Sequence, residues 1–432
     1  MVSQRAGGNE RGAGRHRHRS VGDLTALLLA AVALTTAVVR LHHSGQTPFP
    51  FRRAVSVDAR AELRTEPARF GPLVRVTASV GGDVVDILAF GARARQLERR
   101  SAGEVIHIIG AVEGKSSPHL RLIAITDWDP GSPLARSANR VRVTMAAGVS
   151  NLAPDDRSLF LGLVLGDDRG QRAETVAAFR RAGLSHLTAV SGQNVAYMLV
   201  LFGPLLTRMT SGRRWLATAS LIGWFAVLTR LEPSVLRASA MAVIALTGRS
   251  LGREVRPVRL VSLTIAAVAA ATPHVLTEPG LWLSLSATAG LLFLGPWLSR
   301  RIPAPPALAT ALGTTLAAQL GVLPVQLALF GVPSPVSIPA NLLAGPVAGL
   351  VMVWGLPAGI VAGLVRPLSG RAADLVTVPA LIGVRWVAWV AHVATAVPTP
   401  LAWIALVAAS GWAIARLRSS PDGFAAPREG IR

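Results

Sequence analysis

Five polar side chains interrupt one long apolar stretch of the chain: Ser185, His186, Ser191, Gln193 and Asn194, with Gly192 among them. Polar groups at membrane depth are costly unless they face a cavity or one another, so the cluster is a candidate functional site. Gly192 would let the backbone approach another helix or leave amides free for a phosphate. Neutral donors suit a polyanion that must slide without binding tightly. The alternatives are ordinary helix–helix hydrogen bonding and, for His186, a local helix cap.

Three further polar residues lie in later apolar segments. Arg237 lies near the outer end of the segment 233–247, where a buried arginine must meet an acid or an anion. Glu232 is the nearest acid in sequence, so an ion pair and a phosphate contact both remain open. Gln319 and Asn341 lie beside segments interrupted by proline and glycine, which makes them candidates for the lining of a pathway.

The sequence predicts no catalytic, metal or cofactor site, and hence no enzyme. Cysteine is absent, which excludes disulfides and thiolate chemistry. The pair His16 and His18 has no following acid–histidine ligand set. The phosphate-binding pattern Gly-x-x-x-x-Gly-Lys-Ser/Thr is also absent. The remaining acidic candidates are expected to be helix caps and loop charges rather than metal ligands: Asp155, Asp156, Asp167 and Asp168.

The composition is typical of a polytopic α-helical membrane protein. Hydrophobic residues make up 51% of the chain, and apolar runs recur toward its C-terminal end. The formal net charge of +21 comes almost entirely from arginine, since Lys115 is the only lysine. Retention of basic loops on the cytoplasmic side explains such an excess, so the charge by itself does not indicate nucleic-acid binding.

The order of charged and apolar segments predicts a topology of about ten spans. A basic arm at 1–23 precedes a first transmembrane helix at 24–41; a cleaved signal peptide is the alternative, and both export the next segment. Residues 140–182 read as an interfacial amphipathic segment, and 183–416 as the helical transmembrane domain. Some spans there are expected to be broken or re-entrant. Arginines cluster in alternate loops, which predicts cytoplasmic N- and C-termini, including a tail at 417–432.

Residues 54–130 are predicted to form an exported β domain. Alternating β-branched residues on both sides of Gly81 and Gly82 indicate a hairpin, and further strands follow. About five strands fit a small barrel of oligonucleotide-binding type. A structural or protein-docking role is the alternative to DNA binding, because few aromatic residues are available for base stacking. The arginines expected to contact a phosphate backbone are Arg75, Arg93, Arg95, Arg99 and Arg100.

Sequence blocks between residues 158 and 350 carry a family resemblance. In chain order they are LGLVLGDD at 161–168, FRRAGLSHLTAVSG at 179–192, PSVLRAS at 233–239, LSLSATAGL at 283–291, QLGVLP at 319–324 and ANLLAGPV at 340–347. These blocks closely resemble, in consistent order, those of the ComEC-type competence proteins. The resemblance implies a plasma-membrane channel that takes up single-stranded DNA during natural transformation.

The resemblance also implies partners. They are membrane lipid, a DNA receptor, a cytoplasmic motor ATPase and a separate nuclease, while assembly into a homo-oligomer is left open. Two departures matter: Asn194 stands where many relatives have histidine, and we expect a short form without the C-terminal metallo-β-lactamase-like domain that many relatives carry.

Other classes of function stay open beside the channel. One is a secondary transporter or lipid-handling protein, although no internal repeat is evident and the deep polar cluster is neutral. The other is a scaffold homologue without transforming activity.

Overall fold

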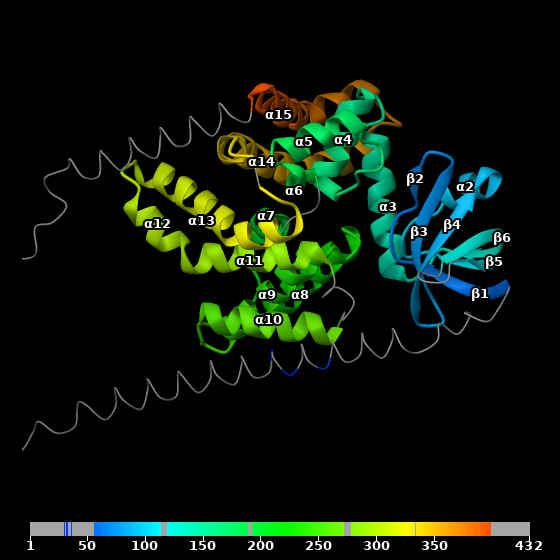
Figure 1. Cartoon of the computed structure of the whole chain (residues 1–432), viewed down its shortest axis with the longest axis horizontal. Helices are drawn as coiled ribbons and strands as arrows, with labels where there is room; N and C mark the ends of the chain where they lie inside the picture. Colours follow the sequence, from blue (N-terminus) through cyan, green and yellow to red (C-terminus); the bar gives the residue numbers. More distant parts are fainter. Residues whose placement is uncertain are drawn as a thin grey trace, which may run out of the picture.

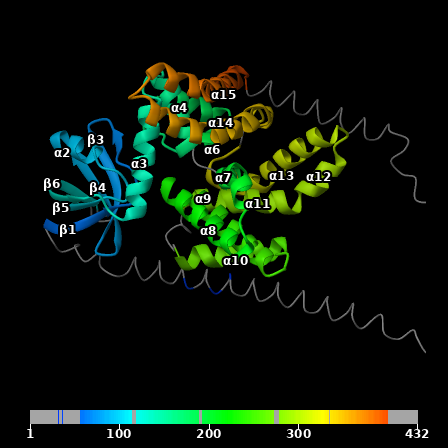
Figure 2. The ribbon, with the colours of Figure 1, turned by 180° about the vertical axis from the view of Figure 1, so that it is seen from behind.

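The computed structural model describes residues 56–113, 119–188, 192–271, 278–332 and 334–398, together with Ala30, Val32 and Thr36. The predicted basic arm, most of the predicted first transmembrane helix, Ser191 and the predicted tail lie outside the described residues. Figure 1 shows a β domain next to a larger helical domain, and Figure 2 shows the same arrangement from behind.

The β domain is a closed barrel of five strands, with a short sixth strand at its edge. Neighbouring strands follow the order β1, β5, β6, β4, β3, and β3 pairs back with β1. The β4–β6 pairing is parallel, and the other pairings are antiparallel. The strands are β1 Ser56–Leu63, β2 Ala68–Phe70, β3 Leu73–Val80, β4 Asp83–Phe90, β5 Val105–Glu113 and β6 His119–Asp129. The predicted five-stranded barrel is confirmed.

Local sequence explains the barrel. Gly81 and Gly82 connect β3 to β4 with φ angles of 61° and 96°, values that two-residue hairpin turns require and glycine adopts easily. Alternate residues of β3 face inward, and Val74, Val76, Ala78 and Val80 are completely or almost completely buried. Helix α2 (Gly91–Glu98) buries Ala94 and Leu97 in the same core.

The helical domain begins with α3 (Pro133–Gly148), which lies between the barrel and the other helices (Figure 1). Its main core gathers side chains from many helices, including the fully buried Phe160, Phe179 and Phe225. Several helices carry proline in the first turn, where the missing N–H costs nothing. The other helices are α4 Pro154–Leu165, α5 Ala173–Arg181, α6 Ser185–Thr188, α7 Gly192–Leu206, α8 Ser211–Leu228, α9 Pro233–Ser250, α10 Pro257–Ala271, α11 Pro279–Phe293, α12 Gly295–Arg301, α13 Pro306–Leu329, α14 Ser337–Val365 and α15 Gly370–Ala396.

Three described helices are long and apolar enough to cross a membrane: α13, α14 and α15. A fourth span results if α11 and α12, which are bent by 51° at their junction, are counted together. Helices α7 and α10 are apolar but shorter. The described helices therefore support a membrane protein, while the predicted count of about ten spans is not confirmed.

Candidate functional site

Arg237 is the most unusual of the predicted site residues, because it is buried without a carboxylate partner among the described residues. It lies one turn into α9, and 7% of its surface is exposed. Its Nε donates to Ser284 Oγ at 2.7 Å, and its Nη1 donates to Thr288 Oγ1 at 2.8 Å and to Met241 Sδ at 3.1 Å. Of the two partners left open by the sequence, the Glu232 ion pair is therefore not formed.

The start of α7 packs directly against Arg237. A Cβ atom added to Gly192 would lie 2.7 Å from Arg237 Nη2 and 3.1 Å from Ala238 Cβ, so only glycine fits there without displacement. The structure thus brings together two predicted site residues, Gly192 and Arg237.

A second group of predicted residues surrounds the carbonyl of Gly183. Asn341 Nδ2 donates to that carbonyl at 3.4 Å and to Ser337 O at 2.8 Å. Ser337 Oγ in turn lies 3.4 Å from Gln319 Oε1. The structure therefore links Gln319 and Asn341 through Ser337, at the junction of α13, α14 and the segment that leads into α6.

The remaining residues of the polar cluster do not share one face. His186 lies on α6 with an exposed side chain, three residues after Gly183. On α7, Gln193 is exposed while Asn194 is buried. Successive residues of a helix point about 100° apart, so Gln193 and Asn194 point in different directions. Ser191 lies outside the described residues.

The five predicted DNA-contacting arginines come from one stretch of the sequence, which begins in β3 and ends just after α2. Four of them are exposed: Arg75, Arg93, Arg95 and Arg99. Arg75 is paired with Asp86 at 2.7 Å, which neutralises part of its charge. The partly buried Arg100 places its guanidinium 4.9 Å from the ring centroid of Trp128.

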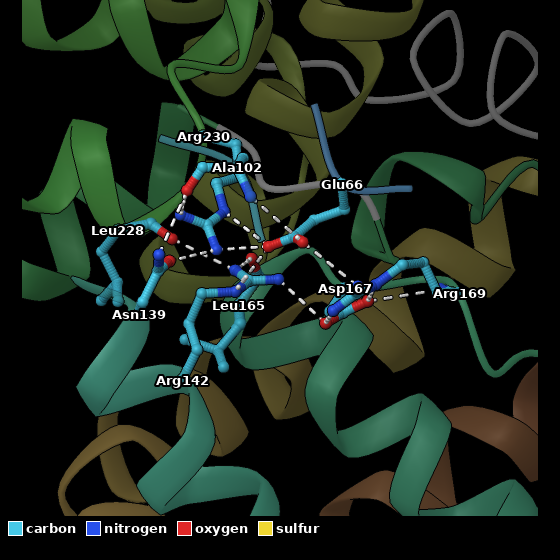
Figure 3. Close-up of polar contacts among 9 residues, drawn as sticks. All are labelled: Glu66, Ala102, Asn139, Arg142, Leu165, Asp167, Arg169, Leu228 and Arg230. Atoms are coloured by element: carbon cyan, nitrogen blue, oxygen red, sulfur yellow. Dashed lines mark hydrogen bonds and ion pairs between the residues drawn. The ribbon is translucent and has the colours of Figure 1, made fainter. Parts of the chain in front are cut away.

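A buried ionic network joins the β domain to the helical domain, and the sequence did not reveal it (Figure 3). Its centre is Glu66, between β1 and β2, which accepts two hydrogen bonds from Arg230 in the α8–α9 turn and one from Arg169 Nη1 at 3.1 Å. Arg142 of α3 lies between Glu66 and Asp167, with Nη2 2.9 Å from Asp167 Oδ2. One signal was present in the sequence: the loops that alternate with the arginine-rich ones, near 230–232, 273–280, 330–338 and 398–399, are predicted to lie outside and contain Arg230 as their only arginine.

Backbone groups complete this network. Arg142 Nη1 donates to the carbonyls of Leu165 and Leu228, both at 3.1 Å. Arg230 Nη2 donates to Asn139 Oδ1 at 2.7 Å. Arg230 itself has a φ angle of 63°, and the next residue, Leu231, has 56°. Two consecutive non-glycine residues in the left-handed region are costly, so the contacts of Arg230 hold the turn in place.

Opposite charges set the ionisation of the network. Burial raises the pKa of Asp167, but hydrogen bonds from Arg169 and the positive charges of Arg142 and Arg169 outweigh it and lower this pKa to about 2. The neighbouring carboxyl of Asp168 has a raised pKa because of burial and the charge of Asp167. Within the described residues, no group of three or more histidine or acidic side chains is arranged to hold a metal ion.

Comparison with known proteins identifies the helical domain. Relatives include ComE operon protein 3 of Bacillus subtilis (strain 168), 28% identical over 217 residues, which are 49% of this chain and 27% of that protein. Uncharacterized protein YcaI of Escherichia coli (strain K12) is 30% identical over 233 residues, 49% of this chain and 30% of that protein. The chain thus spans less than a third of the length of these relatives. No solved structure matches it significantly.

A family model described as competence protein matches residues 163–421. This range includes Gly192, Arg237, Gln319 and Asn341, whereas Glu66 and Arg142 precede it. The resemblance seen in the sequence blocks is confirmed. Because the match covers more than half of the chain, this protein belongs to the competence protein family.

Proposed function

We propose that this protein is an inner-membrane channel through which single-stranded DNA enters the cell during natural transformation. Membership of the competence protein family supports a role in DNA uptake. The observation that carries the finer proposal is Arg237, a buried cation that meets hydroxyl groups instead of a carboxylate. Because no carboxylate pairs with this cation, its positive charge can attract the phosphates of a passing strand.

The neighbours of Arg237 suit transient contacts. The neutral hydroxyls of Ser284 and Thr288 accept hydrogen bonds from the guanidinium, which fix its position but supply no counter-charge. Gly192 of α7 lets the backbone lie close to the same guanidinium. As a strand moves, each phosphate would contact Arg237 briefly and then be replaced by the next phosphate, so no single phosphate is bound tightly.

The β domain supports the same proposal. Its closed five-stranded barrel, with one parallel pairing and a helix between β4 and β5, supports the proposal of an oligonucleotide-binding fold. We propose that it is exported and receives the strand, with its exposed arginines on the phosphate backbone. A DNA receptor, a cytoplasmic motor ATPase and a nuclease on other polypeptides would supply delivery, energy and strand removal.

The test compares three variants in a transformable host that lacks its own copy of this protein. We expect Arg237→Gln to lower entry of labelled single strands into the cytoplasm by about tenfold or more, because a charged hydrogen-bonding contact is worth roughly 1.5–3 kcal/mol. Arg237→Lys should restore part of the uptake. Arg208→Gln, which removes an exposed arginine at the end of α7, should leave uptake unchanged.

Membrane levels of all variants are measured in parallel by immunoblotting. Normal strand entry with Arg237→Gln at wild-type protein levels would refute the role of Arg237. Normal entry without the protein would refute the channel itself.

A further inference from the structure

We propose that Arg142, Arg169 and Arg230 form a second phosphate-binding site, for the backbone of single-stranded DNA, and that Glu66 of the β domain occupies this site in the present conformation. The inference rests on the proposed function, because the ligand is the transported strand. It adds a site outside the membrane path, at the contact between the two domains (Figure 3).

The geometry of the three arginines is that of an oxyanion site. All three direct a guanidinium nitrogen at the Glu66 carboxylate: Arg230 through Nε at 2.8 Å, Arg169 through Nη1 at 3.1 Å and Arg142 through Nε at 3.6 Å. Arginine forks bind carboxylates and phosphates in the same planar, two-pronged way. A phosphodiester with two terminal oxygens can therefore replace a carboxylate at this place.

The charge of the network favours that replacement. With Glu66 and Asp167 in place, three arginines meet two carboxylates. When the β domain withdraws, Glu66 leaves with it, and the three arginines remain beside Asp167 and its neighbour Asp168. The uncovered surface then carries an excess of positive charge, which attracts a polyanion more strongly than the docked network does.

The contact between the domains is narrow enough to open. The strands contact α2 within their own domain but make few contacts with the helices from α3 to α15. Glu66 and the carbonyl of Ala102 supply the polar contacts of the β domain with the α8–α9 turn. The site also has an entrance: 35% of the Arg169 side chain is exposed, against 10% for Glu66. A strand can thus first contact Arg169 and then displace Glu66.

Docking and DNA binding are consequently linked. A ligand that binds only the undocked conformation shifts the equilibrium toward it, and anything that weakens docking raises the apparent affinity of that ligand. Removal of the Glu66 charge should therefore strengthen the binding of single-stranded DNA. A purely structural role for Glu66 predicts no such gain.

The test uses the full-length protein in lipid nanodiscs and fluorescence anisotropy with a labelled oligothymidylate. We expect Glu66→Gln to bind the probe about tenfold more tightly than wild type, because the competing carboxylate loses its charge. Glu98→Gln is the matched control: it removes the same charge from the same domain, where Glu98 pairs with Arg69 at the surface. It should raise the affinity far less.

A second variant and a second measurement keep the outcome clear. Adding Arg169→Gln to Glu66→Gln should cancel the gain in affinity. Spin labels at Val84→Cys and Val176→Cys, two exposed positions on β4 and α5 in a chain without cysteine, should report a longer distance when the probe is added to otherwise wild-type protein.

Equal affinities for Glu66→Gln and Glu98→Gln, or an unchanged label distance with probe bound, would overturn the proposal. Either result would leave the channel intact if Arg237→Gln still blocks strand entry. Failure of the channel proposal would instead appear as normal strand entry in cells that lack the protein, independently of these binding measurements.

Discussion

Arg237 and Arg142 are both buried arginines, yet their partners differ in kind. Arg142 lies between the carboxylates of Glu66 and Asp167, whereas Arg237 donates to the hydroxyls of Ser284 and Thr288. A buried charge that loses its only counter-charge is strongly destabilising. We therefore assign a structural and docking role to the carboxylate contacts of Arg142, and a role in anion contact to Arg237.

The pH dependence of the network follows from Asp167. Its pKa in the folded protein, about 2, lies below that of the unfolded chain, so its ionised form stabilises the fold above about pH 4, and this stabilisation is lost as the pH falls toward 2. We expect Asp167→Asn to destabilise the protein by roughly 2 kcal/mol at pH 7. The difference from wild type should shrink below about pH 4 in thermal unfolding curves. A difference that stays constant between pH 7 and pH 3 would contradict this.

Two glycines determine how closely helices α11 and α13 pack. A Cβ atom on Gly290 would lie 2.1 Å from Ala317 O, and one on Gly321 would lie 2.4 Å from Ser286 O. Small residues at such crossings let two backbones approach, which is a main source of packing energy between helices in a membrane. The helix pair is thus held together by shape, without an ion pair between the two helices in the described residues.

Substitution of one of these glycines should separate the two helices. We expect Gly321→Ala to destabilise the protein by about 1–3 kcal/mol, because backbone atoms cannot move aside for the added methyl group. Gly345→Ala on α14 is the control, since a Cβ atom there meets nothing within 4 Å and alanine favours helix. Thermal stability in detergent, followed by fluorescence-detected size exclusion, measures both. Equal stability of the two variants would contradict this prediction, because it would show that α11 and α13 can move apart at little cost.

At the scale of the molecule, contacts of α3 limit the distance between two interhelical connections, the α8–α9 turn and the α14–α15 connection. Arg142 on this helix contacts Leu228 at the end of α8, and Gly148, six residues later, accepts hydrogen bonds from Arg366 after α14. Six helical residues rise only about 9 Å, far less than the ~30 Å of a hydrocarbon core. The distribution of arginines in the loops predicts that Arg230 lies outside the membrane and Arg366 inside. The contacts of α3 instead favour the same side of the membrane for both residues.

Cysteine labelling decides between the two topologies. The chain contains no cysteine, so each introduced thiol is the only one present. We expect Leu368→Cys, 87% exposed beside Arg366, to react with a membrane-impermeant maleimide added to intact cells. Leu251→Cys, 67% exposed in the basic connection after α9, should react only after the cells are opened. Protection of position 368 in intact cells would support the arginine count instead.

The barrel was accessible from sequence because its information is local. Two-residue alternation and the pair Gly81 and Gly82 specify strands, a turn and an inward face without reference to distant residues. Spans were harder to predict: within the described residues, α7 and α10 are shorter than a membrane crossing, and α11 is bent against α12. Hydropathy reports how apolar a segment is, not whether it crosses, bends or returns.

The sequence by itself determined a membrane protein with a β barrel, a competence-family helical domain and a short set of polar residues in apolar surroundings. Only the tertiary structure decided their partners. Gly192 meets Arg237, Gln319 and Asn341 meet through Ser337, and Glu66 reaches Arg230 across 164 residues of chain. The physical reason is that helix and strand patterns depend on near neighbours, whereas the counter-charge of a buried group is set by packing between distant segments.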